Sequence, residues 1–292
     1  MEQIKTVGLT KYYGKSRGIE ELNLTVEQGD FFGFIGPNGA GKSTTIRTLL
    51  GLISPSAGSA QVLGMDIRTD VEKILANVGF MPSEAMFYNG MRVRDIIKMS
   101  AELRKKNCAD EAKQLCEALQ LDTSKKIEEL SLGNRKKAAI VCAMQHKPDL
   151  YIFDEPTSGL DPLIQREFFS LLAQRNREGA TVFLSSHVLS EIQRYCNRAA
   201  VIRDGRLIAC ASVESLTSAN AKLVTVHGSA ELSGLKGIRD MRETGGVSSF
   251  LYSGDLQELL KLLCVSPVTD LTIAEPDLEE IFMHYYAGGD EK

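Results

Sequence analysis

Short hydrophobic runs separated by polar turns occur in the first part of the chain and again in its middle, and they predict buried β-strands. Phe31 to Ile35 contains no polar side chain, as in a strand that is covered on both faces. Comparable runs occur at Leu150 to Phe153, Thr181 to Leu184 and Ala199 to Ile202. Helical segments after Pro162 and Val188 separate these runs. We therefore predict an α/β fold with a mostly parallel sheet covered by helices.

A helical periodicity interrupts this alternation. Apolar residues recur at helical spacing among charges from Arg92 to Lys106 and again from Asp110 to Leu121. This pattern predicts a helical subdomain, at about residues 84–146, inserted after the first strands.

The pattern changes again after residue 217. Leu223 to Val226 is typical of a strand, and helical patterns follow at Leu256 to Leu263 and Leu278 to Tyr286. We expect two domains, 1–217 and 218–292, of which the second is a small α/β domain without a recognisable catalytic grouping.

Composition excludes several classes of function. The net charge of -4 and the lack of a basic face argue against nucleic acid as a partner. The six cysteines are scattered without a C-x-x-C pair, so we expect small buried side chains in a reducing compartment, and neither a disulfide framework nor a metal site. No stretch approaches the roughly 18 apolar residues that cross a bilayer, so any membrane role must come through a partner.

A glycine-rich turn follows the first apolar run and matches G-x-x-x-x-G-K-[ST] between a strand and a helix. In such a loop backbone N–H groups converge on phosphate oxygens, Lys42 reaches the β/γ-phosphates, and the Ser43 hydroxyl can ligate Mg²⁺. A turn that binds nothing is the alternative, but the flanking strand and helix favour the phosphate loop. The predicted binding residues are Gly36, Pro37, Asn38, Gly39, Ala40, Gly41, Lys42, Ser43 and Thr44.

Two acids follow the strand at Leu150 to Phe153. Open α/β sheets bind ligands at the carboxyl ends of their strands, which is where Asp154 and Glu155 lie. We expect Asp154 to hold Mg²⁺, directly or through water, and Glu155 to orient and deprotonate the attacking water. Two acids at an ordinary surface turn are the alternative.

Further motifs occur in a fixed order over residues 1 to about 215. Leu130-Ser131-Leu132-Gly133-Asn134 resembles the L-S-G-G-Q signature of the ATP-binding cassette (ABC) transporter ATPases. Ser158-Gly159-Leu160-Asp161 resembles the D-loop of that family, His187 its switch histidine, and Tyr13 the aromatic that stacks on adenine. The resemblance implies a P-loop NTPase sheet with an inserted helical subdomain.

The resemblance also implies how the chain works. ATP and Mg²⁺ would be its cofactors, with Tyr13 on the adenine and Asp161 in the nucleotide-binding set. Glu155 and His187 would act with Lys42 in hydrolysis. Ser131 and Gly133 would approach the γ-phosphate of an ATP bound to the other subunit of a head-to-tail homodimer, which closes on ATP. An integral membrane permease would dock on the helical insert, so that the chain is cytoplasmic and peripheral on the inner face of the cell membrane.

The signature segment has a physical reading of its own. Ser131 is a good N-cap for a helix that runs through Met144, whereas Arg135, Lys136 and Lys137 crowd its first turns, where the helix dipole disfavours cations. An anion nearby would resolve this conflict. A solvated helix face is the alternative.

Two departures from the family pattern stand out. Leu132 and Asn134 replace the usual Gly and Gln, from which we expect a weaker contact with the other subunit. In Met81-Pro82-Ser83-Glu84, Ser83 stands where the family has a Gln. We expect Glu84 to have taken over the metal and water contacts of that Gln, or the role to be lost.

The segment from Ala274 to Phe282 resembles the appendage of bacterial drug, peptide and lipid export ATPases, so we expect an exporter subunit. A soluble ABC-type ATPase is one alternative, which the single phosphate loop and the lack of sustained heptads disfavour. A regulatory subunit of low activity is another: the two departures favour it, whereas Glu155 and His187 oppose it.

Overall fold

The computed structural model describes residues 1–217, 222–229, 232 and 234–274. The chain divides into two compact units, Met1–Cys210 and Ala211–Lys292. The domain boundary predicted between residues 217 and 218 lies on the C-terminal side of this division. The helix predicted from Leu278 to Tyr286 lies outside the described residues.

Six strands form the main sheet of the first unit, and the last of them in the chain ends two residues beyond Cys210. In spatial order they are β11 (Arg206–Ser212), β10 (Arg198–Arg203), β4 (Phe31–Ile35), β9 (Thr181–Ser186), β8 (Leu150–Asp154) and β7 (Val78–Met81). From β10 to β7 every pair of neighbours is parallel, as predicted. The carboxyl ends of β4 and β8 therefore lie at one edge of the sheet, which brings the glycine-rich turn and the two acids to the same side.

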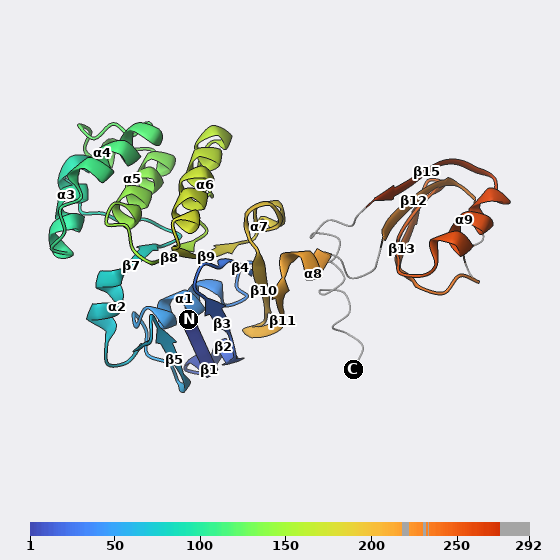
Figure 1. Cartoon of the computed structure of the whole chain (residues 1–292), viewed down its shortest axis with the longest axis horizontal. Coiled ribbons are helices and arrows are strands. Elements are labelled where there is room, and N and C mark those ends of the chain that lie inside the picture. Colours follow the sequence, from blue (N-terminus) through green and yellow to red (C-terminus); the bar gives the residue numbers. More distant parts are fainter. Residues whose placement is uncertain (218–221, 230–231, 233, 275–292) are drawn as a thin grey trace. The chain divides into compact units, whose positions relative to one another are not determined.

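A second, antiparallel sheet was not predicted as a separate layer. Its strands are β2 (Ser16–Leu22), β1 (Glu2–Tyr13), β5 (Ala57–Val62) and β6 (Met65–Asp66), with β3 (Thr25–Glu27) beside β1. Because β1 pairs with β5 across a long stretch of chain, no local signal indicates the pairing. Helix α1 (Lys42–Leu49) lies between the sheets and contacts β8 on one side and β2 and β5 on the other (Figure 1).

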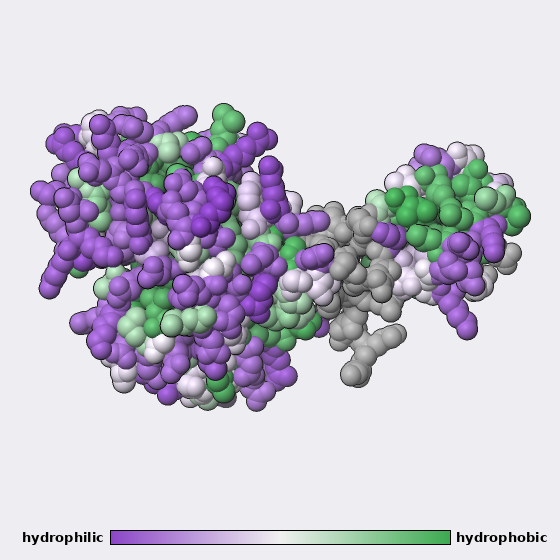
Figure 2. Space-filling model, in the orientation of Figure 1, coloured by the Kyte–Doolittle hydropathy of each residue, from purple (hydrophilic) through white to green (hydrophobic). Residues whose placement is uncertain are grey.

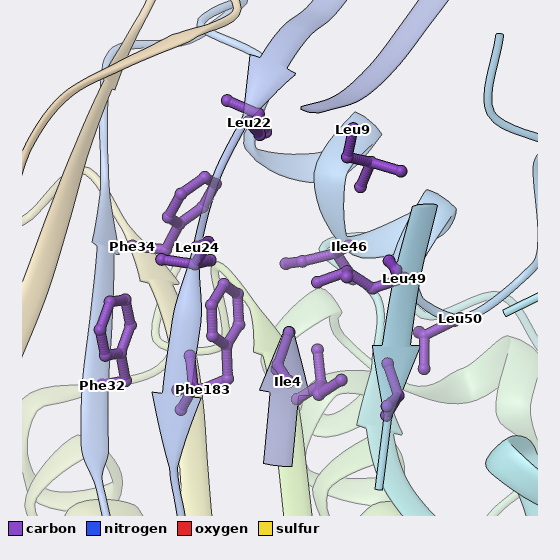
Figure 3. Packing of buried hydrophobic residues seen from close by; sticks show 14 of the residues in the cluster. Ile4, Leu9, Leu22, Leu24, Phe32, Phe34, Ile46, Leu49, Leu50 and Phe183 are labelled. Carbon is purple, nitrogen blue, oxygen red and sulfur yellow. The ribbon is translucent and has the colours of Figure 1, made fainter. Parts of the chain in front are cut away.

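Apolar side chains between the two sheets hold α1 in place. Ile46 and Leu49 of α1 are fully buried and share one cluster with Phe32 and Phe34 of β4 and Phe183 of β9 (Figure 3). The Phe183 ring centroid lies 5.8 Å from that of Phe32 and 5.3 Å from that of Phe34. Burial of each such side chain stabilises the fold by about 2 kcal/mol. The core therefore fixes the helix at whose N-terminus the phosphate loop ends.

Helices α6 (Pro162–Arg177) and α7 (Leu189–Tyr195) cover the other face of the parallel sheet. Phe153 of β8 meets Phe168 of α6 edge to face, with ring centroids 5.2 Å apart. Asp161 caps α6, because its carboxylate accepts the Ile164 N–H at 3.1 Å, and Pro162 occupies the first turn.

The predicted helical insert consists of α3 (Val93–Leu103), α4 (Ala109–Ala118), the 3₁₀ segment η1 (Ile127–Glu129) and α5 (Leu132–Met144). Helix α5 contacts α3, α4 and strand β7 (Figure 1). Arg175 of α6 forms a largely buried ion pair with Glu111 of α4, which also lies 2.7 Å from Lys147. A short helix that was not predicted, α2 (Val71–Asn77), precedes the insert.

The second unit contains α8 (Val213–Thr217) and a four-stranded antiparallel sheet. Its order is β13 (Ile238–Thr244), β14 (Val247–Tyr252), β12 (Lys222–Gly228) and β15 (Val268–Ala274). The predicted helix is α9 (Leu256–Cys264), and its Leu259 and Leu263 are buried in the core of this unit. Leu260 and Val265 are exposed, and Figure 2 shows hydrophobic residues gathered on the visible face of this unit.

The expectation that the cysteines are buried is wrong for two of them. Cys108, Cys116 and Cys196 are buried and Cys142 is half-buried, whereas Cys210 and Cys264 are exposed. Cys210 lies in β11, at the edge of the six-stranded sheet, and Cys264 is the last residue of α9. All six thiols are free.

Replacement of Phe183 by Ala should lower the free energy of unfolding by about 3–5 kcal/mol, because the cavity would lie between the sheets next to α1. Urea denaturation followed by circular dichroism measures this change. The control is Tyr88→Ala, which removes an aromatic side chain that is 71% exposed and should cost less than about 0.5 kcal/mol. Equal midpoints for the two variants would contradict the packing described here.

Candidate active site

The phosphate loop joins β4 to α1 with a conformation that requires glycine. Gly41 has a φ of 109°, and a Cβ atom there would lie 2.7 Å from the Gly18 carbonyl oxygen. No side chain caps α1, and no acidic residue lies in its first turn. The N-terminal N–H groups and the positive end of the helix dipole are therefore available to an anion, as phosphate binding requires.

A cavity of about 320 Å³ opens at this loop, within the range of about 300–1,000 Å³ that is common for ligand sites. It brings together the predicted adenine-stacking residue, most of the phosphate loop and the predicted base. The lining residues are Tyr13, Arg17, Gly18, Pro37, Asn38, Gly39, Gly41, Lys42, Ser43, Thr44, Ser83 and Glu155. Arg17 and Gly18 belong to no motif, and no sequence pattern identified them as site residues.

Lys42 is buried where the loop meets the predicted base. Its Nζ lies 3.0 Å from Glu155 Oε1 as an ion pair without hydrogen-bond geometry, and it donates to the Gly36 carbonyl oxygen at 2.5 Å. The side chain is only 6% exposed. The ammonium charge is thus held at the floor of the loop, at a place from which it can contact a phosphate oxygen.

Glu155 also contacts His187, the histidine that the family resemblance assigns to hydrolysis. Glu155 Oε2 lies 2.6 Å from His187 Nδ1, so the carboxylate bridges the phosphate-loop lysine and the histidine. The turn that carries His187 is held by Ser186, whose hydroxyl accepts the Val188 N–H and donates to Glu191. Burial raises the pKa of the Glu191 carboxyl, because it disfavours the charged form.

Asp154 is buried beside Glu155 and is held by a residue to which the sequence analysis gave no role. The Ser185 hydroxyl donates to Asp154 Oδ1 at 2.6 Å and accepts the Glu155 N–H at 3.1 Å. In the β8–β9 register Ser185 lies directly opposite Asp154. One sequence signal could have identified Ser185. It is one of two serines that end the apolar run before His187.

The signature segment begins α5 as predicted, with Ser131 as its N-cap. The Ser131 hydroxyl accepts the Asn134 N–H at 3.3 Å. Lys136 finds its partner within the chain: its Nζ donates to the Glu155 carbonyl oxygen at 2.8 Å, so no external anion is needed there. Burial lowers the pKa of this lysine, while Glu155 and Asp154 oppose the shift. Ser131, Gly133 and Asp161 do not line the cavity of their own chain.

The loop after β7 separates the two residues considered for the family's Gln role. Ser83 is half-buried and lines the cavity, whereas Glu84 is exposed and is not among the lining residues. This placement favours Ser83, and not Glu84, as the residue that faces the nucleotide. Within the described residues no cluster of three or more His, Cys, Asp or Glu side chains could hold a metal ion. Mg²⁺ at a phosphate loop takes one or two protein ligands and binds the substrate phosphates, so such a cluster is not required.

These features define the chain as a P-loop ATPase with an inserted helical subdomain. Residues 19–158 match the family described as ABC transporter. The chain is 33% identical to the bacitracin transport ATP-binding protein BcrA of Bacillus licheniformis over 98% of each protein. It is 34% identical to the probable multidrug ABC transporter ATP-binding protein YbhF of Escherichia coli over 75% of this chain and 38% of that protein. The chain therefore belongs to the ABC transporter family, as an ATP-binding subunit that hydrolyses ATP.

Solved structures share the fold. The ATP-binding subunit of an ABC transporter aligns with a TM-score of 0.70 and 27% identity, over 73% of this chain and 91% of that one. The cassette MJ0796, solved as a dimer bound to ADP and Pi, aligns with a TM-score of 0.63 over 72% and 98%; at 22% identity this likeness concerns the fold alone. No helix in the described part of the chain has the length and apolarity to cross a bilayer.

The placement of Ser83 and Glu84 predicts opposite outcomes for two variants. Ser83→Gln puts a longer polar side chain at the cavity and should raise kcat about threefold or more, while Glu84→Ala should leave kcat within about twofold of the parent. Steady-state ATP hydrolysis measures both. A large loss in Glu84→Ala without a gain in Ser83→Gln would show that Glu84 had replaced the Gln after all.

Proposed function

We propose that this chain is the ATPase subunit of an exporter and works as a head-to-tail homodimer that closes on ATP. The main observation in support is a continuous series of contacts at the phosphate loop. Lys42 forms an ion pair with Glu155, and Glu155 in turn contacts His187. The export direction is supported by the relatives, which are described as a bacitracin transport protein and a probable multidrug transporter subunit.

Each site residue has a role in this proposal. Tyr13 stacks on the adenine, and the loop N–H groups and Lys42 bind the phosphates. Glu155 orients the attacking water and accepts its proton, and His187 positions the Glu155 carboxylate. Ser43 and Asp154 would hold Mg²⁺, which would neutralise charge on the phosphates.

The head-to-tail pair rests on where the signature segment lies. Ser131 is exposed, and neither it nor Gly133 lines the cavity of its own chain, so both are free to meet ATP held by another copy. Asp161 is exposed in the same way and can contribute across the interface. The dimer of MJ0796 is a property of that protein, and for this chain the pair remains our proposal.

The remaining partners follow from this arrangement. A membrane permease that docks on the insert α3–α5 would receive the movement of closure and would hold the chain at the inner face of the cell membrane. The second unit would tune pairing or coupling, since none of the lining residues of the cavity comes from it. A regulatory subunit of low activity is the competing function, which the Leu132 and Asn134 departures favour.

Glu155→Gln should keep ATP binding and reduce hydrolysis at least about a hundredfold, because an amide cannot accept the proton of water. The closed dimer should then accumulate with Mg-ATP, and size-exclusion chromatography measures it. Lys42→Ala is the contrasting variant: it should weaken ATP binding about tenfold or more, since a charged contact to phosphate is lost.

Two results would contradict the proposal. Hydrolysis at the parental rate in Glu155→Gln would remove Glu155 as the base. A Glu155→Gln protein that binds ATP and stays monomeric would remove the head-to-tail closure. Activity of the parent chain in its purified form, with and without membranes, separates an ATPase from a regulatory subunit.

A further inference from the structure

Glu155 has a backbone conformation that is unusual for its residue type. Its φ is 49°, in the left-handed region that disfavours side chains with a Cβ. Such a conformation persists where neighbouring groups determine it. Three groups do so here. The Ser185 hydroxyl and carbonyl oxygen from β9 both accept the Glu155 N–H, at 3.1 and 3.2 Å, and the Lys136 ammonium from α5 donates to the Glu155 carbonyl oxygen.

Burial of the Lys136 ammonium is unfavourable in free energy, so its position requires a compensating contact. The whole residue is 2% exposed, and its ammonium donates a hydrogen bond to the Glu155 carbonyl oxygen at 2.8 Å. A buried ammonium must be paired or hydrogen-bonded, because transfer from water is strongly unfavourable otherwise. The two nearby carboxylates, Asp154 and Glu155, favour its charged form. The hydrogen bond from Lys136 to the Glu155 carbonyl oxygen, which we call the clamp on Glu155, is therefore short, and its donor is kept charged by the nearby carboxylates.

The same helix begins at the signature segment. Ser131 caps α5, and Lys136 lies just over one helical turn further along. The first turn also touches the loop that follows Glu155, since a Cβ on Gly133 would lie 2.8 Å from the Gly159 carbonyl oxygen. Any shift of the start of α5 therefore acts on the segment after β8 at two places, Glu155 and Gly159.

We propose that Lys136 is a positioning residue for Glu155, and that it links the signature end of α5 to the hydrolytic carboxylate of the same chain. This inference rests on the proposed function, in which the signature end contacts ATP held by the partner. Contact of Ser131 with that ATP would set the position of α5, and Lys136 would set the position of Glu155. Occupancy of one site would thereby prepare the base of the other.

The first experiment replaces Lys136 with Met, which keeps the length of the side chain and removes the donor. We expect kcat to fall about tenfold or more, while ATP affinity and ATP-induced dimerisation stay near the parental values. Lys136→Arg, which retains a cationic donor, should recover most of kcat. Lys137→Met is the matched control. Lys137 is a buried lysine on the same helix, but Lys136 is the lysine of this helix that donates to the Glu155 carbonyl oxygen, so Lys137→Met should change kcat little.

Folding is checked by thermal melts. Should Lys136→Met not fold, Lys136→Gln serves instead, because its shorter side chain ends before the Glu155 carbonyl and should lose kcat likewise. Parental kcat in the folded Met or Gln variant would overturn the proposal. An equal loss in Lys137→Met would also overturn it, as would a failure of Lys136→Arg to recover activity.

A mixed dimer tests the link within one chain. One copy carries Glu155→Gln, so that a single hydrolytic site remains. Adding Lys136→Met to the other copy, whose Glu155 is intact, should remove most of the remaining activity, whereas adding it to the Glu155→Gln copy should have a much smaller effect. The reverse pattern would overturn the proposal. If the chain does not dimerise at all, the proposed head-to-tail function fails, while the kcat of Lys136→Met still tests the clamp on Glu155.

Discussion

The burial of α1 between two sheets is the constraint on which the site depends. The parallel sheet supplies Phe32, Phe34 and Phe183 from one side, and the antiparallel sheet covers the other. Because α1 is locked by this packing, the N–H groups at its start point in one direction. Three segments meet at one edge of the parallel sheet, beside the start of α1. They are the phosphate loop, the acids after β8 and His187 after β9.

Around that helix the polar groups form a connected network. Ser185 links β9 to Asp154 and Glu155, Lys42 links the phosphate loop to Glu155, and Lys136 links the helical insert to it. The residues come from separate segments, so the geometry of the site exists only in the folded chain. The ion pair of Arg175 with Glu111 is a second connection, because it joins α4 of the insert to α6.

Much of this arrangement could be predicted from the sequence. The apolar runs predicted the parallel strands, the phosphate-loop pattern predicted the turn before α1, and Ser131 was recognised as the cap of α5. The apolar runs and the Ser131 cap depend on residues close together in sequence, and the phosphate-loop pattern specifies the type of turn by its residue types and spacing. The antiparallel sheet was missed as a layer because the pairing of β1 with β5 depends on contacts distant in sequence.

The same reason explains why individual side chains could not be placed from the sequence. The sequence analysis interpreted Lys136 as one of three cations that a nearby anion would stabilise. Its actual partner, the Glu155 carbonyl oxygen, lies in another segment of the chain, and no local pattern indicates that contact. Glu84 was expected to face the metal because it has a carboxylate and a long stem, but the course of the loop places Ser83 at the cavity and leaves Glu84 exposed. Residue type indicates what a side chain can do, and only the fold determines what it faces.

Three of the four polar groups of Glu155 make hydrogen bonds, and the fourth, Oε1, has an ion pair alone. The N–H meets Ser185, the carbonyl meets Lys136, and the two carboxylate oxygens meet Lys42 and His187. Oε1 is ion-paired with Lys42 but accepts no hydrogen bond, so it retains the capacity to accept one from a water molecule. In the proposed function a phosphate oxygen would draw Lys42 toward itself, and the arrival of the nucleotide would thereby weaken the one charged contact of Oε1. An order of events, binding before deprotonation, would then follow from the ion pair of a single carboxylate oxygen.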